Sequence, residues 1–238
     1  MSTHERESLN GRVLQFLGPS TGGIRAHVAE LARRLPDHGW DATVAGPDGV
    51  MDGVGSQDAT VDVPPVWNVP AYRPARRRLS SLLSGVDVLH VHGLKAAMVA
   101  VGADQRPPMV LTVHNLVGGT RRGPSAKVLR RAETYVVERC DHLIVISDEI
   151  DERFADVLPT ERRTFILPVA PARSVQRSAP EVRASYGIAA DAPLVTIVAR
   201  HHPQKNLPMF LDAMRLVRER LPEVRGLMVG DGPERGAL

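Results

Sequence analysis

The chain has 238 residues and a formal net charge of +3, from 30 basic and 27 acidic side chains. This length suits one large domain or two smaller ones with a real core, and so small a net charge argues against a polyelectrolyte surface. The single cysteine, Cys140, excludes an internal disulfide and carries no metal-site spacing.

Neither a leader nor a membrane span is visible in the sequence. Residues 1–10 are polar, without the apolar region of a signal peptide, and no apolar run approaches the length of a membrane span. We therefore expect a cytoplasmic protein.

Predicted strands and helices alternate along the chain, which favours an α/β fold with a parallel sheet. A strand is expected at 12–17, a loop at 18–23 and then a helix that stops at Pro36. The further predicted strands are 42–45, 86–92, 109–114, 143–146 and 164–167, and the further helices are 74–83, 95–101 and one capped by Ser125. We expect an N-terminal domain at 1–170, a linker at 171–190 and a second domain at 191–238.

The second predicted domain opens with the apolar run 192–199, which is typical of a parallel strand buried on both faces. Asn206 is expected to cap the next helix, with Pro208 in its first turn. Arg200 follows the strand and Lys205 precedes the helix, so two cations and a helix dipole could hold a diphosphate there.

Lysine is rare in this chain, at only three of the 30 basic residues, so Lys205 suggests a need for a compact point charge. The alternative is that Arg200 and Lys205 are ordinary surface charges on a loop.

This strand–loop–helix unit is followed by Gly230-Asp231-Gly232-Pro233 after another predicted strand. The combination resembles the second-domain opening of GT-B glycosyltransferases, in particular retaining, family 4-like enzymes, where the equivalent Arg and Lys bind the donor diphosphate. The resemblance implies two Rossmann-like parallel-sheet domains, a nucleotide diphosphate sugar as donor and a small-molecule, lipid or glycan acceptor. It implies no cofactor and no metal, because cationic side chains and helix dipoles do that work.

The first loop carries a second part of the resemblance. Gly22 and Gly23 precede a predicted helix and would let backbone amides approach a ligand, although such pairs also occur in ordinary tight turns. In the resembling family this pair, followed a few residues later by a His, lines the cleft at the donor sugar and diphosphate. His27 fits that pattern, but it flanks the buried face of its helix, and we interpret it as a packing residue.

His90, His92 and His114 fall at strand C-termini and are expected at one edge of the sheet. One interpretation is a zinc site, but no acidic or cysteine partner has a helpful spacing. For His90 and His92, hydrogen-bonded strand residues are the simpler interpretation.

His114 differs because Thr112-Val113-His114 resembles the family's Thr-x-His, whose His contacts the transferred sugar and helps to stabilise charge near the reacting centre. A structural role remains the alternative for His114. The predicted site therefore has catalytic residues His114, Arg200 and Lys205, donor-phosphate residues Gly22, Gly23, Arg200 and Lys205, and acceptor-side residues Asn115 and His92.

Arginine clusters occur at 76–78, 121–122 and 130–131. They are typical of solvated faces, with contact to an anionic membrane surface as the alternative. Nucleic-acid binding is disfavoured because aromatic residues make up only 4% of the chain.

The sequence departs from the family pattern in two places. Leu167-Pro168 continues as Val169-Ala170-Pro171, where the family has a Pro-Asn-Gly-Val-Asp turn, and Leu238 is reached before the family's Glu-x7-Glu segment. We therefore expect an incomplete second domain and weak or no turnover by this chain alone. The alternative to a working transferase is a non-catalytic remnant or an interaction protein derived from one.

Overall fold

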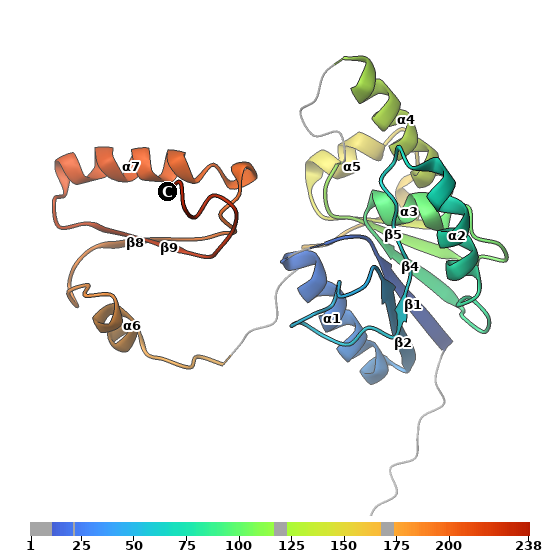
Figure 1. Ribbon diagram of the computed structural model, residues 1–238, viewed down its shortest axis with the longest axis horizontal. Helices are drawn as coiled ribbons and strands as arrows, with labels where there is room; N and C mark the ends of the chain where they lie inside the picture. The colour runs from blue at the N-terminus through green and yellow to red at the C-terminus, as the bar shows by residue number, and fades with distance from the viewer. Residues whose placement is uncertain (1–10, 21, 117–122, 168–173) are drawn as a thin grey trace, which may run out of the picture. The chain divides into compact units, whose positions relative to one another are not determined.

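The computed structural model describes residues 11–20, 22–116, 123–167 and 174–238, without the side chains of 124 and 125. The chain divides into two compact units, Met1–Pro171 and Ala172–Leu238 (Figure 1). The predicted linker at 171–190 is too long, because it contains the helix α6, Ala179–Ser185, which belongs to the second unit.

Unit 1 is built on a seven-stranded parallel sheet with the order β3-β2-β1-β4-β5-β6-β7, which confirms the predicted α/β class. Chain order reverses between β1 and β4, and ligands of open parallel sheets bind at such a point, beyond the carboxyl ends of the strands. The strands are β1 Gly11–Leu17, β2 Trp40–Gly46, β3 Ala59–Thr60, β4 Val88–His92, β5 Met109–Val113, β6 His142–Val145 and β7 Arg163–Phe165.

Helices cover the sheet of unit 1 on both faces (Figure 1). On one face Val28 of α1 packs with Leu17 and Val44, and on the other face α2, α3, α4 and α5 contribute to a larger apolar cluster. The helices are α1 Gly23–Arg34, α2 Val69–Ser80, α3 Leu94–Ala100, α4 Pro124–Glu138 and α5 Asp148–Phe154, with the 3-10 turns η1 Leu35–His38 and η2 Thr160–Arg162. The N-cap of α4 is Gly123 rather than the predicted Ser125.

Two short helices were not predicted, although each begins with a capping signal. The Ser147 side chain accepts a hydrogen bond from the backbone N–H of Ile150 at the start of α5, whose first turn is acidic. Ser178 and Glu181 form a reciprocal capping box at the start of α6. In both cases the cap was readable in the sequence, but the helix has only seven residues and shows little apolar periodicity.

Unit 2 contains α6, β8 Leu194–Val198, η3 Pro203–Lys205, α7 Leu207–Arg220 and β9 Arg225–Val229, with β8 and β9 parallel. The prediction that β8 is buried on both faces is wrong: Val195 is 42% exposed and Val198 77%. The sheet that the described residues form here has only two strands, and side chains of β8 remain exposed on it. Asn206 is the N-cap of α7, as predicted, but it has a left-handed conformation (φ 46°) and its side chain makes no cap hydrogen bond.

Candidate functional site

Polar side chains gather on one face of the three central strands of unit 1. Gln15 of β1 lies opposite His90 of β4, and His92 lies opposite Thr112 of β5. Because side chains alternate along a strand and stay in register across parallel neighbours, these four point to the same face of the sheet. His114 follows the end of β5, so this polar group reaches the carboxyl edge of the sheet.

The histidines of this group contact one another. The Nε2 of His92 lies 2.7 Å from the Oε1 of Gln15, and its Nδ1 lies 3.3 Å from the Nε2 of His114. The ring of His27, from α1, lies with its centroid 5.9 Å from that of His92 and 5.6 Å from that of His114. The ring centroid of His90 lies 4.2 Å from that of His92, with the two rings tilted by 39°, and the Nε2 of His90 lies 2.8 Å from the Thr112 hydroxyl. We call His27, His90, His92 and His114 the histidine cluster.

Burial keeps the histidine cluster neutral. Burial, and to a smaller extent the positive charges that neighbouring histidines would carry, lower the pKa of His90 to about 3 and the pKa of His114 to about 4. The same causes hold the pKa of His92 well below its ordinary value, and burial lowers the pKa of His27. At neutral pH the cluster therefore offers hydrogen bonds but no positive charge. Among the described residues no group of three or more His, Cys, Asp or Glu side chains is placed to hold a metal ion.

The structure changes the assignments of two histidines. His92 is only 2% exposed, and both of its ring nitrogens are within hydrogen-bond distance of protein atoms, so it has none left for an acceptor molecule. His27 was interpreted as a packing residue, yet its ring joins His92 and His114. Half-buried His114 and exposed Asn115 lie on the segment that follows β5.

Sequence reasoning also missed Gln15, although the signal was present. It is the one polar residue in the otherwise apolar run Val13–Leu17, and it is fully buried.

The glycine pair lies at the start of α1. Gly22 is the N-cap and Gly23 the first helical residue, and both are exposed. A Cβ built on either glycine would meet no described atom within 4 Å, so the backbone here is open to an approaching group. The first amides of α1 therefore provide a suitable position for an anion.

Arg200 and Lys205 lie on one loop of unit 2, between β8 and α7, and both are exposed. The backbone N–H of Lys205 donates to the carbonyl of His202 at 2.8 Å, which closes the turn η3 two residues before α7. The segment after β9, Gly230-Asp231-Gly232-Pro233, needs its first glycine, because a Cβ on Gly230 would lie 1.9 Å from the carbonyl oxygen of Ala199. Only glycine allows this close approach of the two loops.

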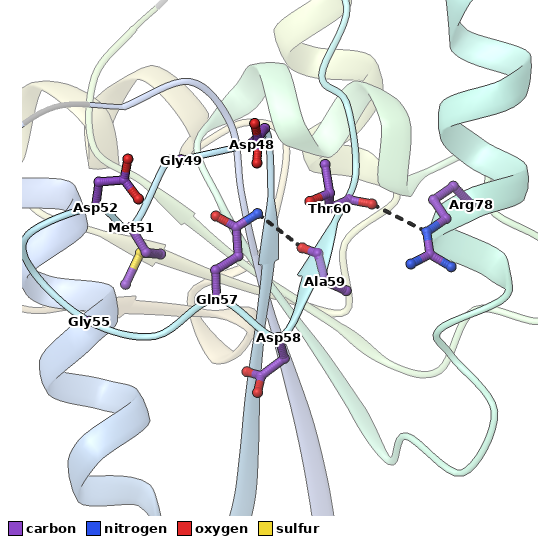
Figure 2. Close-up of a pocket in the computed structure, with 10 residues that line it drawn as sticks. All are labelled: Asp48, Gly49, Met51, Asp52, Gly55, Gln57, Asp58, Ala59, Thr60 and Arg78. Carbon is purple, nitrogen blue, oxygen red and sulfur yellow. Dashed lines mark hydrogen bonds between the residues drawn. The ribbon is translucent and has the colours of Figure 1, made fainter.

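A cavity of about 460 Å³ lies beside β3, and none of the residues that line it in the described part of the chain belongs to the predicted site. Figure 2 shows its lining, where Gln57 donates to the carbonyl of Ala59 and Arg78 to that of Thr60. The Gln57 amide also donates to two further carbonyls, and the Asp58 carboxylate accepts from the backbone N–H of Val44. These groups hold the loop 47–58 in place, and we assign the cavity a structural role.

Residues 21–169, more than half of the chain, match the sequence profile of glycosyltransferase family 4. The D-inositol 3-phosphate glycosyltransferase of Thermobispora bispora is 26% identical over 250 residues, which cover 87% of this chain and 55% of that protein. The chain thus spans about half the length of this relative.

Solved structures agree on the fold. Anabaena HepE in complex with UDP is 18% identical, with a TM-score of 0.70 over 94% of this chain and 62% of that one. Sucrose-phosphate synthase from Thermosynechococcus elongatus is 16% identical, with a TM-score of 0.67 over 92% of this chain and 62% of that one. Together with the profile match, which includes Gly22, Gly23 and His114, these likenesses confirm the GT-B resemblance. The chain belongs to glycosyltransferase family 4.

Proposed function

We propose that this protein is a retaining glycosyltransferase that moves a sugar from a nucleotide diphosphate sugar to a hydroxyl acceptor. The observation that carries the proposal is the family match over residues 21–169, which contains the glycine pair and His114. The donor class is supported by HepE, whose structures hold UDP or UDP-glucose.

In the proposed reaction the bond from the sugar to the diphosphate breaks as the acceptor hydroxyl attacks the same face of the sugar, without a protein nucleophile. Negative charge then develops on the leaving diphosphate. Arg200, Lys205 and the amides at Gly22 and Gly23 would stabilise that charge, because preorganised cations and N–H groups lower the barrier most where charge appears. His114 would contact the transferred sugar. Since burial holds the pKa of His114 at about 4, it would act through a hydrogen bond and not as a cation.

We further propose that residues 1–170 bind the acceptor, with Asn115 on the acceptor side, and that residues 191–238 bind the nucleotide sugar.

The proposed reaction also needs no metal or cofactor. Two cationic side chains and a helix N-terminus supply the positive potential that a divalent cation otherwise provides.

Contact with a membrane surface is a further part of the proposal, on the cytoplasmic side. Trp67 is 81% exposed and Val69 71%, directly before and at the start of α2, which also exposes Arg77 and Arg78. Apolar residues beside arginines suit the interface of an anionic bilayer. The described part of the chain holds no helix long and apolar enough to cross a membrane. Cosedimentation with vesicles of phosphatidylglycerol is expected for the parent chain and reduced for Trp67→Ser.

A thermal-shift screen of nucleoside diphosphates and sugar nucleotides tests the donor half of the proposal. A nucleotide that binds the folded state raises the melting temperature, and the shift grows with the logarithm of its concentration once that concentration exceeds Kd. Release of nucleoside diphosphate from the sugar nucleotide so identified, in a coupled assay, then tests transfer. Binding without release would favour the alternative, a non-catalytic binding protein derived from such an enzyme. No binding by any nucleotide would contradict both.

A further inference from the structure

Gln15 is an unusual residue for the centre of a parallel sheet. It is 0% exposed, and its neighbours in β1, Leu14 and Phe16, belong to the apolar core. Its side-chain Nε2 is buried and has no hydrogen-bond partner among the described residues. A buried amide donor without a partner costs free energy, so Gln15 is not explained by a contribution to stability. Its side-chain oxygen, in contrast, has one close partner, the Nε2 of His92 at 2.7 Å.

This contact determines which nitrogen of His92 carries the proton. An amide oxygen can only accept, so the Nε2 of His92 must be the N–H donor. A neutral imidazole carries one proton, and the Nδ1 of His92 is therefore a bare acceptor.

The same reasoning extends to His114. Its Nε2 lies 3.3 Å from the bare Nδ1 of His92, and a hydrogen bond between them requires that the Nε2 of His114 carries the proton. The Nδ1 of His114 is then left with a lone pair. Among the described residues, the other titratable groups in contact with these rings are His27 on α1 and His90 on β4, whose pKa values burial lowers, so they place no positive charge beside the two tautomers.

We propose that Gln15 is a positioning residue that acts through His92 to fix His114 as the tautomer with a protonated Nε2 and a bare Nδ1. The functional meaning rests on the proposed transferase activity. A bare nitrogen accepts a hydrogen bond from a sugar hydroxyl, whereas the oxygens of an ionised diphosphate can only accept and make no such bond. His114 is thereby assigned to the sugar and not to the phosphates of the donor.

Imidazole ¹⁵N NMR on the full chain tests this directly, because protonated and bare ring nitrogens have well-separated chemical shifts. At neutral pH we expect protonated Nε2 and bare Nδ1 for both His92 and His114. Gln15→Met keeps nearly the same volume but removes the acceptor, and it should leave both histidines as mixtures of the two tautomers.

Thr164→Val is the matched control. It removes a side-chain bond of 2.8 Å to His142 on strands of the same sheet, outside the histidine cluster, and should change the signals of His142 alone.

Two results would overturn the proposal: a protonated Nδ1 on His92 in the parent chain, or parent tautomers retained in Gln15→Met. The parent spectrum decides the first even if the variant does not fold. Neither measurement requires turnover or a bound nucleotide, so a failure of the proposed function would be seen separately, in the nucleotide-release assay.

Discussion

At the scale of single residues, burial decides the chemistry of the candidate site. The histidine cluster brings together four imidazoles that would each be partly charged in water at pH 6.5. Because they are buried next to one another, charging any of them costs desolvation and repulsion, and they remain neutral in the folded chain. In the proposed reaction, the positive potential for the diphosphate would then come from exposed groups such as Lys205.

The first prediction is that the fold loses stability as the pH falls below about 6.5. The pKa values of these histidines are lower in the folded than in the unfolded chain, so the unfolded chain takes up protons first and is favoured by acid. For a folded pKa of about 4, as for His114, the loss between about pH 7 and about pH 5 is up to roughly 2 kcal/mol per group. Urea unfolding at the two pH values measures it.

A variant identifies the source of the acid effect. His90→Gln should lose less unfolding free energy between the two pH values than the parent, because one buried neutral imidazole is removed. An equal loss in the variant and the parent would place the titrating groups elsewhere.

The second prediction separates the roles of Lys205 and His114. Where turnover is measurable, Lys205→Ala should lower it by about 10²-fold or more, the effect of losing one donor to a developing oxyanion, and should also weaken binding of the nucleoside diphosphate. His114→Ala should lower turnover but leave the affinity for the nucleoside diphosphate almost unchanged, because a neutral imidazole offers the phosphates no charge. Isothermal titration with the diphosphate and the release assay measure the two effects. Unchanged turnover of Lys205→Ala would remove it from the site.

Part of the site could be predicted from local sequence. His92, His114 and the glycine pair lie at or just after the ends of strands that the sequence predicts. The contacts among Gln15, His92 and His27 could not be predicted, because they join residues up to 77 positions apart through strand order and register. A polar residue inside an apolar strand was the only local sign of Gln15.

At the scale of elements, one device recurs at the beginning of strands in unit 1. An aspartate directly before one strand makes two hydrogen bonds to a single residue of the neighbouring strand. Its backbone N–H donates to the carbonyl of that residue, and its carboxylate accepts from the backbone N–H of that residue. The two bonds hold the two strands in register. The pairs are Asp87 with Arg12, Asp141 with Met109 and Asp58 with Val44, with carboxylate distances of 2.7 Å in each.

The third prediction concerns Asp141, which also accepts from Arg106 at 3.2 Å. Asp141→Ala should lower the free energy of unfolding by about 1–2 kcal/mol, the lower part of the range for bonds to a charged group, because this side chain is partly exposed. Denaturant unfolding at neutral pH measures the change. Asp156→Ala, at an exposed aspartate outside this arrangement, should change stability much less. Similar losses of unfolding free energy for both variants would mean that Asp141 stabilises the fold no more than an ordinary surface aspartate does.

The same scale shows where periodicity misleads. Val128 and Tyr135 fall in the helical apolar spacing of α4, yet they are 66% and 44% exposed. The helix instead buries Glu133, whose carboxylate pairs with Arg153 of α5 at 3.0 Å. A charged residue can be buried only with such a partner, and apolar spacing within one helix contains no information about a partner 20 positions away. Strands such as β5 were predicted well because their apolar runs are nearly continuous.

At the scale of the whole chain, the two units differ in how much apolar surface they bury. Unit 1 has two apolar clusters around a sheet covered on both faces. In the described part of unit 2 the buried apolar residues are Leu207, Met214 and Val224. Large apolar side chains of unit 2 remain exposed on both strands and on α7: Val195, Val198, Met209, Leu211, Leu216, Val217 and Val229. The alternating pattern of the sequence predicted both sheets, but it gave no measure of how completely each would be covered.

The fourth prediction follows from that difference. The fragment 1–171 should fold alone and unfold in one cooperative transition, since its sheet and both clusters lie within it. The fragment 172–238 should show no cooperative transition and should bind the dye ANS, because two strands and one covering helix bury too little apolar surface to offset the entropy of ordering the chain. Circular dichroism melts of both fragments and the full chain, with ANS fluorescence, measure this.

The comparison also tests how the loop of Arg200 and Lys205 is held. If the main transition of the full chain coincides with that of fragment 1–171, unit 2 gains no stability from unit 1, and the loop that carries Arg200 and Lys205 is ordered only by local bonds such as that from Lys205 to His202. A nucleoside diphosphate should then bind weakly, since part of its binding energy must order the loop. A sharp, independent transition of fragment 172–238 would contradict this account, because it would mean that β8, β9 and α7 form a stable core despite their exposed apolar side chains.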